Sequence, residues 1–299
     1  MNPLQLLTRA IGPYADIPTV GLRLAIGLLV SAVIALLAYR RQSLSQSGAW
    51  GAVLIGTIIF GLGGLPWGLL LIAFFVTSSI FTHYQQRRKE ALADHAAKTG
   101  RRDLGQVLAN GGIGALLAAA FALTGGNQII FFFAFVGAMA AVTADTWATE
   151  LGVLSPEKPR LITTGERVER GSSGGVSSLG LAAAVAGAWA ISFLGFALVL
   201  GQYALTGDLL TLRVVWLPLL AALGGVAGSL VDSLLGATVQ CTYYCPQCGK
   251  ETEQPIHRCG RQPIHIRGWH WLDNDWVNVA ASLTGVLVTV LLGALVLYL

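Results

Sequence analysis

Two aspartates lie inside long apolar runs of this 299-residue chain. Asp145 follows FFFAFVGAMAAVTA, and Asp232 follows LPLLAALGGVAGSLV. A carboxylate at the centre of a membrane span costs roughly 2.5–3.5 kcal/mol to insert, so each acid needs compensation. Such acids usually pair with a cation, a metal or a water-filled pathway. The two aspartates therefore indicate a functional site, with hydrogen bonding between helices as the alternative.

Further oxygen ligands lie at the ends of apolar runs. They are Glu150, Asp273, Asp275 and Asn278. Oxygen ligands suit Mg²⁺, which takes one or two carboxylates and completes its shell with water and substrate phosphates. The alternative for the last three residues is the capped start of a helix at the membrane interface.

A Gly/Ser cluster, GSSGG, opens another apolar run. Its backbone N–H groups, its hydroxyls and a helix N-terminus could together cradle phosphate, and nearby arginines could pair with it. The residues of this predicted cradle are Arg160, Arg167, Arg170, Gly171, Ser172, Ser173, Gly174, Gly175 and Ser177. A helix cap with close helix packing is the alternative. The cluster is not a Walker A loop, since no Gly-Lys-Ser/Thr follows it.

All four cysteines lie in CTYYCPQCGKETEQPIHRCG. Cys245-x-x-Cys248-Gly resembles half of a zinc knuckle, and His257-x-Cys259-Gly resembles the other half. The predicted structural Zn²⁺ ligands are Cys245, Cys248, His257 and Cys259, with Cys241 as a possible fourth thiolate. Reduced thiols without metal are the alternative, because a cytoplasmic loop disfavours disulfides.

The composition is that of an integral membrane protein. Hydrophobic residues make up 54% and charged residues 11%, against about 25% charged in soluble domains. We predict an all-α polytopic fold with about eight transmembrane segments. The apolar runs lie near residues 20–38, 48–62, 65–82, 104–124, 128–148, 174–200, 212–236 and 276–298. The second is short and rich in glycine, so a re-entrant segment is its alternative.

Most of the 19 lysines and arginines follow the first, third, fifth and seventh runs. The positive-inside rule therefore predicts that these loops are cytoplasmic and that both termini lie outside the cell (inner) membrane. The basic charge reflects topology, and we expect no nucleic-acid partner. We expect an interfacial lead-in at 1–19 and one transmembrane domain at 20–299. Its predicted cytoplasmic loops are 83–103, 149–173 and 237–275, and the last two are long enough to suggest function.

Two stretches share an order of landmarks. SGAWGAVLIG, VTSS and QVLANGG parallel SGGVSSLG, VDSL and DWVNVAAS. Each set would enter a span at Ser-Gly and place Asn110 or Asn278 early in a third span. This order predicts a parallel internal repeat, with chance similarity as the alternative.

Four segments carry a family resemblance: ADTWATELG, PRLITTGERVERGSSGGVS, GSLVDSLLGA and WLDNDWVN. In this order they resemble the DUF92 family of integral membrane proteins, which includes plant phytyl-phosphate kinases and a vertebrate transmembrane protein. The resemblance implies a kinase that converts a polyprenyl monophosphate, such as phytyl or geranylgeranyl phosphate, to the diphosphate. It implies a nucleoside triphosphate donor, CTP as in related phytol and dolichol kinases, or ATP. It leaves the exact lipid open.

Residue roles follow from the residues rather than from the resemblance. We predict that Asp145, Glu150 and Asp232 hold Mg²⁺, and that the cradle residues, together with Asn110, bind the nucleotide. Asp273, Asp275 and Asn278 would then close the site. The main alternative is an ion- or proton-coupled transporter that uses the intramembrane acids. A prenyl transferase is a third, although only residues 273–275 resemble its aspartate motif.

Overall fold

A computed structural model describes residues 17–92, 101–124, 129–206, 212–257 and 259–298. Eight helices in these ranges are long and apolar enough to cross a membrane. The prediction of an all-α polytopic fold is therefore confirmed. Residues 1–16 of the expected lead-in and 93–100 of the first basic loop lie outside the described residues.

Helices dominate the described residues, and short strands lie in the long connections between them. The helices are α2 (Ile17–Arg40), α3 (Gln46–Ile58), the π-helical turn η1 (Ile59–Gly63), α4 (Leu65–His83), α5 (Gln86–Leu92), α6 (Leu104–Leu123), α7 (Ile129–Gly152), α8 (Ser178–Thr206), the 3-10 turn η2 (Leu212–Trp216), α9 (Leu217–Thr238) and α10 (Asn274–Tyr298). The strands are β1 (Arg160–Leu161), β2 (Gly175–Val176), β3 (Thr242–Cys245), β4 (Lys250–Thr252) and β5 (Ile264–Arg267). β1 pairs with β2, and β3 lies between β4 and β5, all antiparallel.

The short second run is a continuous helix. α3 continues through the π-helical turn, so the helical segment extends from Gln46 to Gly63. Gly64 follows with φ of 89°, a conformation that glycine adopts without steric cost, and α4 begins at the next residue. The 18-residue length favours a full span over a re-entrant segment.

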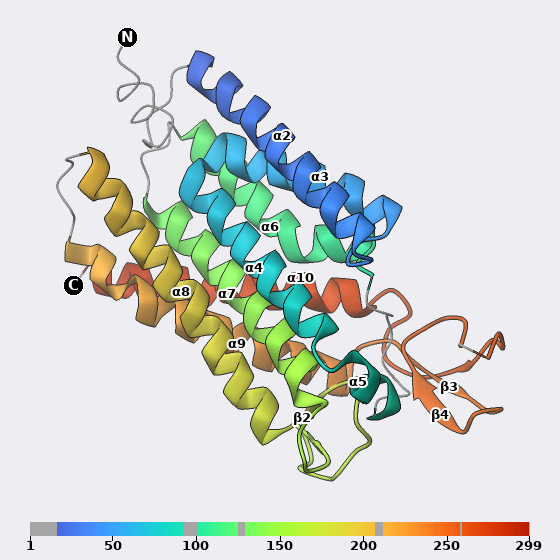
Figure 1. The fold of residues 1–299 in the computed structure, drawn as a ribbon. Helices are drawn as coiled ribbons and strands as arrows, with labels where there is room; N and C mark the ends of the chain where they lie inside the picture. The colour runs from blue at the N-terminus through green and yellow to red at the C-terminus, as the bar shows by residue number, and fades with distance from the viewer. Residues whose placement is uncertain (1–16, 93–100, 125–128, 207–211, 258, 299) are drawn as a thin grey trace.

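α7 is the central helix of the bundle (Figure 1). Every residue from Phe132 to Ala144 is buried, and the helix packs against α4, α6, α8, α9 and α10. A helix that is apolar on all sides is stable only when other helices surround it. Asp145 is the first residue after this buried stretch, so the core of the bundle ends at the acid.

α7 and α9 approach closely because α9 carries glycines at the contact. A Cβ atom on Gly225 would lie 2.8 Å from the Ala140 Cβ, and one on Gly228 would lie 2.6 Å from the Ala141 Cβ. Small residues at such contacts let helix backbones approach closely in membranes. Both helices run toward the end of the bundle that carries β2, β3 and β4 (Figure 1).

The three long connections gather at that same end, where α5, β2, β3 and β4 lie (Figure 1). They are more ordered than loops: α5 occupies part of 83–103, α7 continues to Gly152, and the segment 239–273 (hereafter the insert) holds three strands. Glu150 therefore lies on a helix rather than in the expected loop at 149–173. The side of the membrane and the internal repeat stay predictions.

Candidate functional site

Asp145 and Asp232 are brought together by the packing of α7 on α9. Each lies four residues beyond the contact of Ala141 with Gly228, and the two helices run in the same direction. Four residues are about one helical turn, so both acids continue the same contact face. The charge of Asp145 acts directly on Asp232, and both carboxylates are half-buried.

A third carboxylate, Glu253, comes from the insert. Its charge acts on both aspartates, and it accepts a short hydrogen bond from the Ser173 hydroxyl. The Gly/Ser cluster is thereby connected to the acidic pair. Sequence reasoning missed Glu253 because it follows Lys250 and Glu251 in a polar hairpin, where an acid usually faces solvent.

The two aspartates have no basic partner among the described residues. The Oδ2 atom of Asp232 is buried and accepts no hydrogen bond from any residue that the structure describes. Uncompensated acids in a low-dielectric environment repel one another, and a divalent cation would remove that repulsion. The three carboxylates do not all converge within 4.8 Å. Mg²⁺ does not require all three at once, because it usually keeps waters and takes substrate oxygens alongside one or two carboxylates.

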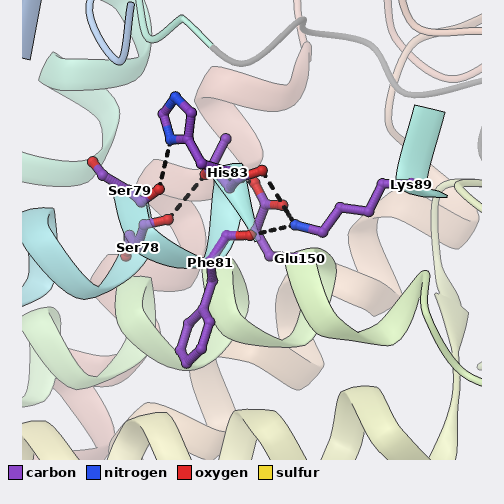
Figure 2. Close-up of polar contacts among 7 residues, drawn as sticks. Ser78, Ser79, Phe81, His83, Lys89 and Glu150 are labelled. Carbon is purple, nitrogen blue, oxygen red and sulfur yellow. Dashed lines mark hydrogen bonds and ion pairs between the residues drawn. The ribbon is translucent and has the colours of Figure 1, made fainter. Parts of the chain in front are cut away.

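Glu150, the third predicted Mg²⁺ ligand, is engaged elsewhere. Its Oε2 lies 2.5 Å from Lys89 Nζ, and its Oε1 accepts a 2.7 Å hydrogen bond from the Thr82 hydroxyl. Figure 2 shows Lys89 reaching both Glu150 and the carbonyl of Phe81. Glu150 is five residues beyond Asp145, which on a helix is about 140° around the axis. The structure therefore places Glu150 in a clamp between α4, α5 and α7 rather than beside the aspartates.

Replacing Glu150 by glutamine is expected to lower the free energy of unfolding by about 2–3 kcal/mol, because Lys89 would stay mostly buried without a counter-charge. The side chains of Lys89 and Glu150 are only 10% and 22% exposed. Combining Glu150→Gln with Lys89→Met should cost less than the sum of the single changes. Thermal unfolding in detergent measures this coupling. Unchanged stability in the glutamine variant would contradict the clamp.

The Gly/Ser cluster docks onto the end of α9. Gly174 has φ of 77°, and a Cβ atom there would lie 2.5 Å from the backbone nitrogen of Ala237. Ser177 accepts a 3.1 Å hydrogen bond from the Gly180 N–H and donates one to the Gly152 carbonyl, so it caps α8 and ties it to α7. The helix-cap alternative thus describes Ser177, while Ser173 faces Glu253.

The arginines of the predicted cradle take different positions. Arg170 Nη2 donates to the carbonyls of Ser155 (3.1 Å) and Pro156 (2.9 Å), and therefore braces its own loop. Arg160 Nη1 donates to the Gly165 carbonyl at 2.9 Å. Arg167 is exposed. Their role toward a nucleotide stays a prediction, and Arg167 has the most solvent-accessible position for it.

The residues that enter α10 form a helix cap. Asp273 Oδ1 accepts hydrogen bonds from the N–H groups of Asp275 (3.0 Å) and Trp276 (3.2 Å). Asn278 is 9% exposed and donates to the Asn274 carbonyl. The capping alternative therefore describes Asp273, whereas closure of the site by these residues stays a prediction.

Asp275 lies beside the start of α6, and Asn110 is part of α6. A Cβ atom on Gly105 would lie 2.3 Å from Asp275 Oδ2, which places this carboxylate at the start of α6. Asn110 lines an apolar cavity of about 80 Å³ between α2, α3, α4 and α6 that also contains Arg102. Its Oδ1 is buried and has no partner in the described part of the chain. The structure thus assigns Asn110 to this cavity and not to the Gly/Ser cluster.

Four of the five predicted zinc ligands form a cluster. The ligand atoms of Cys245, Cys248, His257 and Cys259 lie within 4.8 Å of one another. The Sγ atoms of Cys245 and Cys259 are 3.6 Å apart, and His257 Nδ1 is 3.2 Å from Cys259 Sγ. Zn–S and Zn–N bonds of about 2.3 and 2.0 Å in a tetrahedron imply ligand separations of about 3.3–3.8 Å. Cys241 lies instead with His265 and His270.

Two thiols of this cluster have pKa values shifted in opposite directions. Burial acts to raise the pKa of Cys245, but hydrogen bonds with Cys248 and Cys259 outweigh it, so that pKa lies below the usual value. Hydrogen bonding to Cys259, followed by burial and the contact with Cys245, raises the pKa of Cys248 to about 11. A thiolate at this position near neutral pH therefore requires a bound cation.

Comparison with known proteins identifies the family. The model of the family described as "Integral membrane protein DUF92" matches residues 29–286, and the chain belongs to this family. The chain is 37% identical over 275 residues to Protein PGR of Arabidopsis thaliana, covering 87% of this chain and 93% of that protein. It is 36% identical to the membrane protein MJ0933 of Methanocaldococcus jannaschii, covering 72% and 83%. It is 27% identical to Protein VTE6, chloroplastic, of Arabidopsis thaliana, covering 85% and 66%. No solved structure matches.

Proposed function

We propose that this member of the DUF92 family is a Mg²⁺-assisted kinase that converts a polyprenyl monophosphate, such as phytyl or geranylgeranyl phosphate, to the diphosphate. CTP or ATP would be the phosphoryl donor. One observation carries the proposal: Asp145 and Asp232 lie near enough for their charges to interact at the end of two spans, and Glu253, bonded to Ser173, relates them to the Gly/Ser cluster. The loops would face the cytoplasm and both termini the outside of the cell (inner) membrane.

This arrangement provides what phosphoryl transfer requires. When bound, Mg²⁺ would supply positive charge that neutralises the phosphates and helps to orient them. Asp145 and Asp232 would hold the ion, and Ser173 would orient Glu253 beside them. An oxygen of the lipid phosphate attacks the terminal phosphorus of the donor, and the bond to the leaving nucleoside diphosphate breaks. The attacking phosphate is already ionised at neutral pH, so the reaction needs no protein base.

The four-ligand cluster would stabilise the hairpin that carries Glu253, and thereby the site around the aspartates. We propose that Cys245, Cys248, His257 and Cys259 bind a structural Zn²⁺, since four protein ligands leave no position for substrate. The ion would stabilise the hairpin of β3 and β4, and Glu253 follows β4 directly. Zinc would thereby help to hold Glu253 near the aspartates.

Replacing Ser173 by alanine is expected to lower turnover about tenfold, because Glu253 would lose the hydrogen bond that orients it toward the aspartates. The matched control is Ser178→Ala at the exposed start of α8, outside the predicted cradle, whose turnover should stay within about twofold of wild type. Initial rates of diphosphate formation measure both. Equal effects of the two substitutions would show that the Ser173 contact is not used.

The acidic pair is also compatible with a second function, that of an ion- or proton-coupled transporter. Two half-buried carboxylates without basic partners among the described residues would suit the coupling site of an ion- or proton-driven transporter. A transporter has no evident use for the connection from Asp232 through Glu253 to the Gly/Ser cluster. If CTP or ATP protects residues 153–177 from proteolysis, that result favours the kinase over the transporter.

The deciding experiment is an assay of the detergent-purified protein with Mg²⁺. Phytyl or geranylgeranyl monophosphate is combined with CTP or ATP in parallel reactions, and mass spectrometry identifies the lipid product. A lipid diphosphate that forms only with Mg²⁺ would support the kinase and identify the donor. Absence of product from every pair, with protein that elutes as a single folded species, would overturn the proposal.

A further inference from the structure

Cys241, His265 and His270 form a second cluster in the insert. One ligand atom from each lies within 4.8 Å of the other two. Cys241 is 3% exposed, His265 is half-buried and His270 is exposed, so the cluster extends from the interior to the surface. The linear spacing gives no sign of it, because the cysteine precedes the first histidine by more than twenty residues. The cluster forms because β5 pairs with β3.

We infer that Cys241, His265 and His270 bind a second divalent ion of the Zn²⁺ class, in a three-ligand site with one open coordination position. Thiolate and imidazole select zinc and similar transition metals, whereas Mg²⁺ prefers oxygen. Four protein ligands close a structural zinc site, whereas three leave a position for water or an exchangeable ligand. The exposed His270 places that position at the surface of the insert.

An unpaired nitrogen supports the site independently. His265 Nε2 is buried and has no hydrogen-bond partner in the described ranges. A buried polar atom left without a partner costs about 1–3 kcal/mol, and a bound metal ion would remove that cost. Buried orphan nitrogens of this kind are rare in folded proteins, so each calls for a partner.

The surroundings also supply the outer contacts that metal ligands usually have. The ring of His265 stacks on that of His270 with centroids 3.9 Å apart and meets the Tyr243 ring edge-on at 5.7 Å. The Tyr243 side chain is also hydrogen-bonded to the Cys241 side chain. Contacts of this kind orient metal ligands and hold their geometry.

The position of the cluster indicates what the ion would do. The Cys241 N–H donates to the Leu272 carbonyl at 2.8 Å, and the Trp269 N–H donates to the Val239 carbonyl at 2.9 Å. Arg267, which lies on β5 with His265, donates hydrogen bonds to the Gly236 and Ala237 carbonyls near the end of α9. The ligands therefore join the chain leaving α9 to the chain entering α10. A bound ion would hold these two helix ends together and fix the base of the insert.

The test is the zinc content of the full-length protein, purified from zinc-supplemented medium and measured by inductively coupled plasma mass spectrometry. We expect two zinc ions per wild-type chain and one in His270→Ala. Cys248→Ser, in the four-ligand cluster, should also hold one, and the combination should hold none. His83→Ala is the control, because His83 binds the Ser79 carbonyl outside both clusters and should leave two. Size-exclusion elution confirms that each variant is folded.

A second readout keeps the test decisive if one variant does not fold. With Co²⁺ in both sites, four thiolates contribute to the sulfur-to-metal absorption band, and Cys241→Ser should lower it by about a quarter. One zinc ion in wild type that persists in His270→Ala would overturn the second site. If Cys248→Ser held no zinc while His270→Ala kept its zinc, the only ion would belong to the four-ligand cluster, and this result would also overturn the second site. None of these outcomes depends on kinase activity.

Discussion

Replacing Asp232 by asparagine is expected to lower turnover at least about 100-fold while leaving the fold intact or more stable. Turnover falls because the amide removes a charge that would hold Mg²⁺ against the phosphates. Stability does not fall, because the substitution also removes the charge of a buried carboxylate oxygen that has no hydrogen-bond partner within the described ranges, together with its repulsion by Asp145 and Glu253. Initial rates and thermal unfolding of the same preparations measure the two effects.

The matched control is Glu157→Gln, which removes one exposed acid from the connection after α7 and should change neither quantity. Titration with Mg²⁺ gives a readout that needs no substrate. Mg²⁺ should raise the unfolding temperature of wild type and of the control, because it binds the folded state. It should not do so for Asp232→Asn. Full turnover in this variant would remove the metal assignment and with it the proposed mechanism.

Replacing Gly228 by alanine is expected to damage both the fold and the site. The new Cβ atom would lie 2.6 Å from the Ala141 Cβ and 2.6 Å from the Ala281 carbonyl oxygen, so α9 must move away from α7 and α10. Overpacking of this kind costs about 1–3 kcal/mol. The same movement separates Asp232 from Asp145. Because catalysis depends on the separation of positioned groups, turnover should fall about 100-fold.

Gly112→Ala is the control for this change. Gly112 lies within α6, and a Cβ atom there would have no atom of the described residues within 4 Å. Alanine at that position should be neutral or stabilising by up to about 1 kcal/mol, since glycine is the poorer helix former. Thermal unfolding and initial rates compare the two variants. Equal behaviour of both would show that the α7 and α9 contact does not position the aspartates.

Several features of the molecule could be predicted from local sequence. The eight spans follow from runs of apolar residues, because a helix needs about 20 such residues to cross the hydrocarbon core of a bilayer. That Cys245 and Cys248 belong to one cluster follows from their close spacing in a tight turn. Asp145 and Asp232 were visible because a charge in an apolar run is costly and therefore unusual.

Other features depend on which segments pack together, and no local pattern encodes that. Glu253 reaches the aspartates only because the insert folds back over the end of α9, and its polar neighbours in the sequence conceal it. Glu150 resembled a third ligand because it is near Asp145 in sequence, yet the helix turns it toward Lys89. Linear proximity on a helix does not imply a shared face.

The division follows from the range of the forces involved. By itself the sequence determined which segments are apolar enough to cross the membrane, which residues are chemically unusual, and that Cys245 and Cys248 lie close together, because insertion cost and turn spacing are local. Only the tertiary structure decided that Asp145 and Asp232 lie near each other, since their proximity depends on Gly228 fitting against Ala141 on another helix. It also separated Cys241 from the knuckle and placed it with His265 and His270, because the pairing of β3 with β5 spans the whole insert.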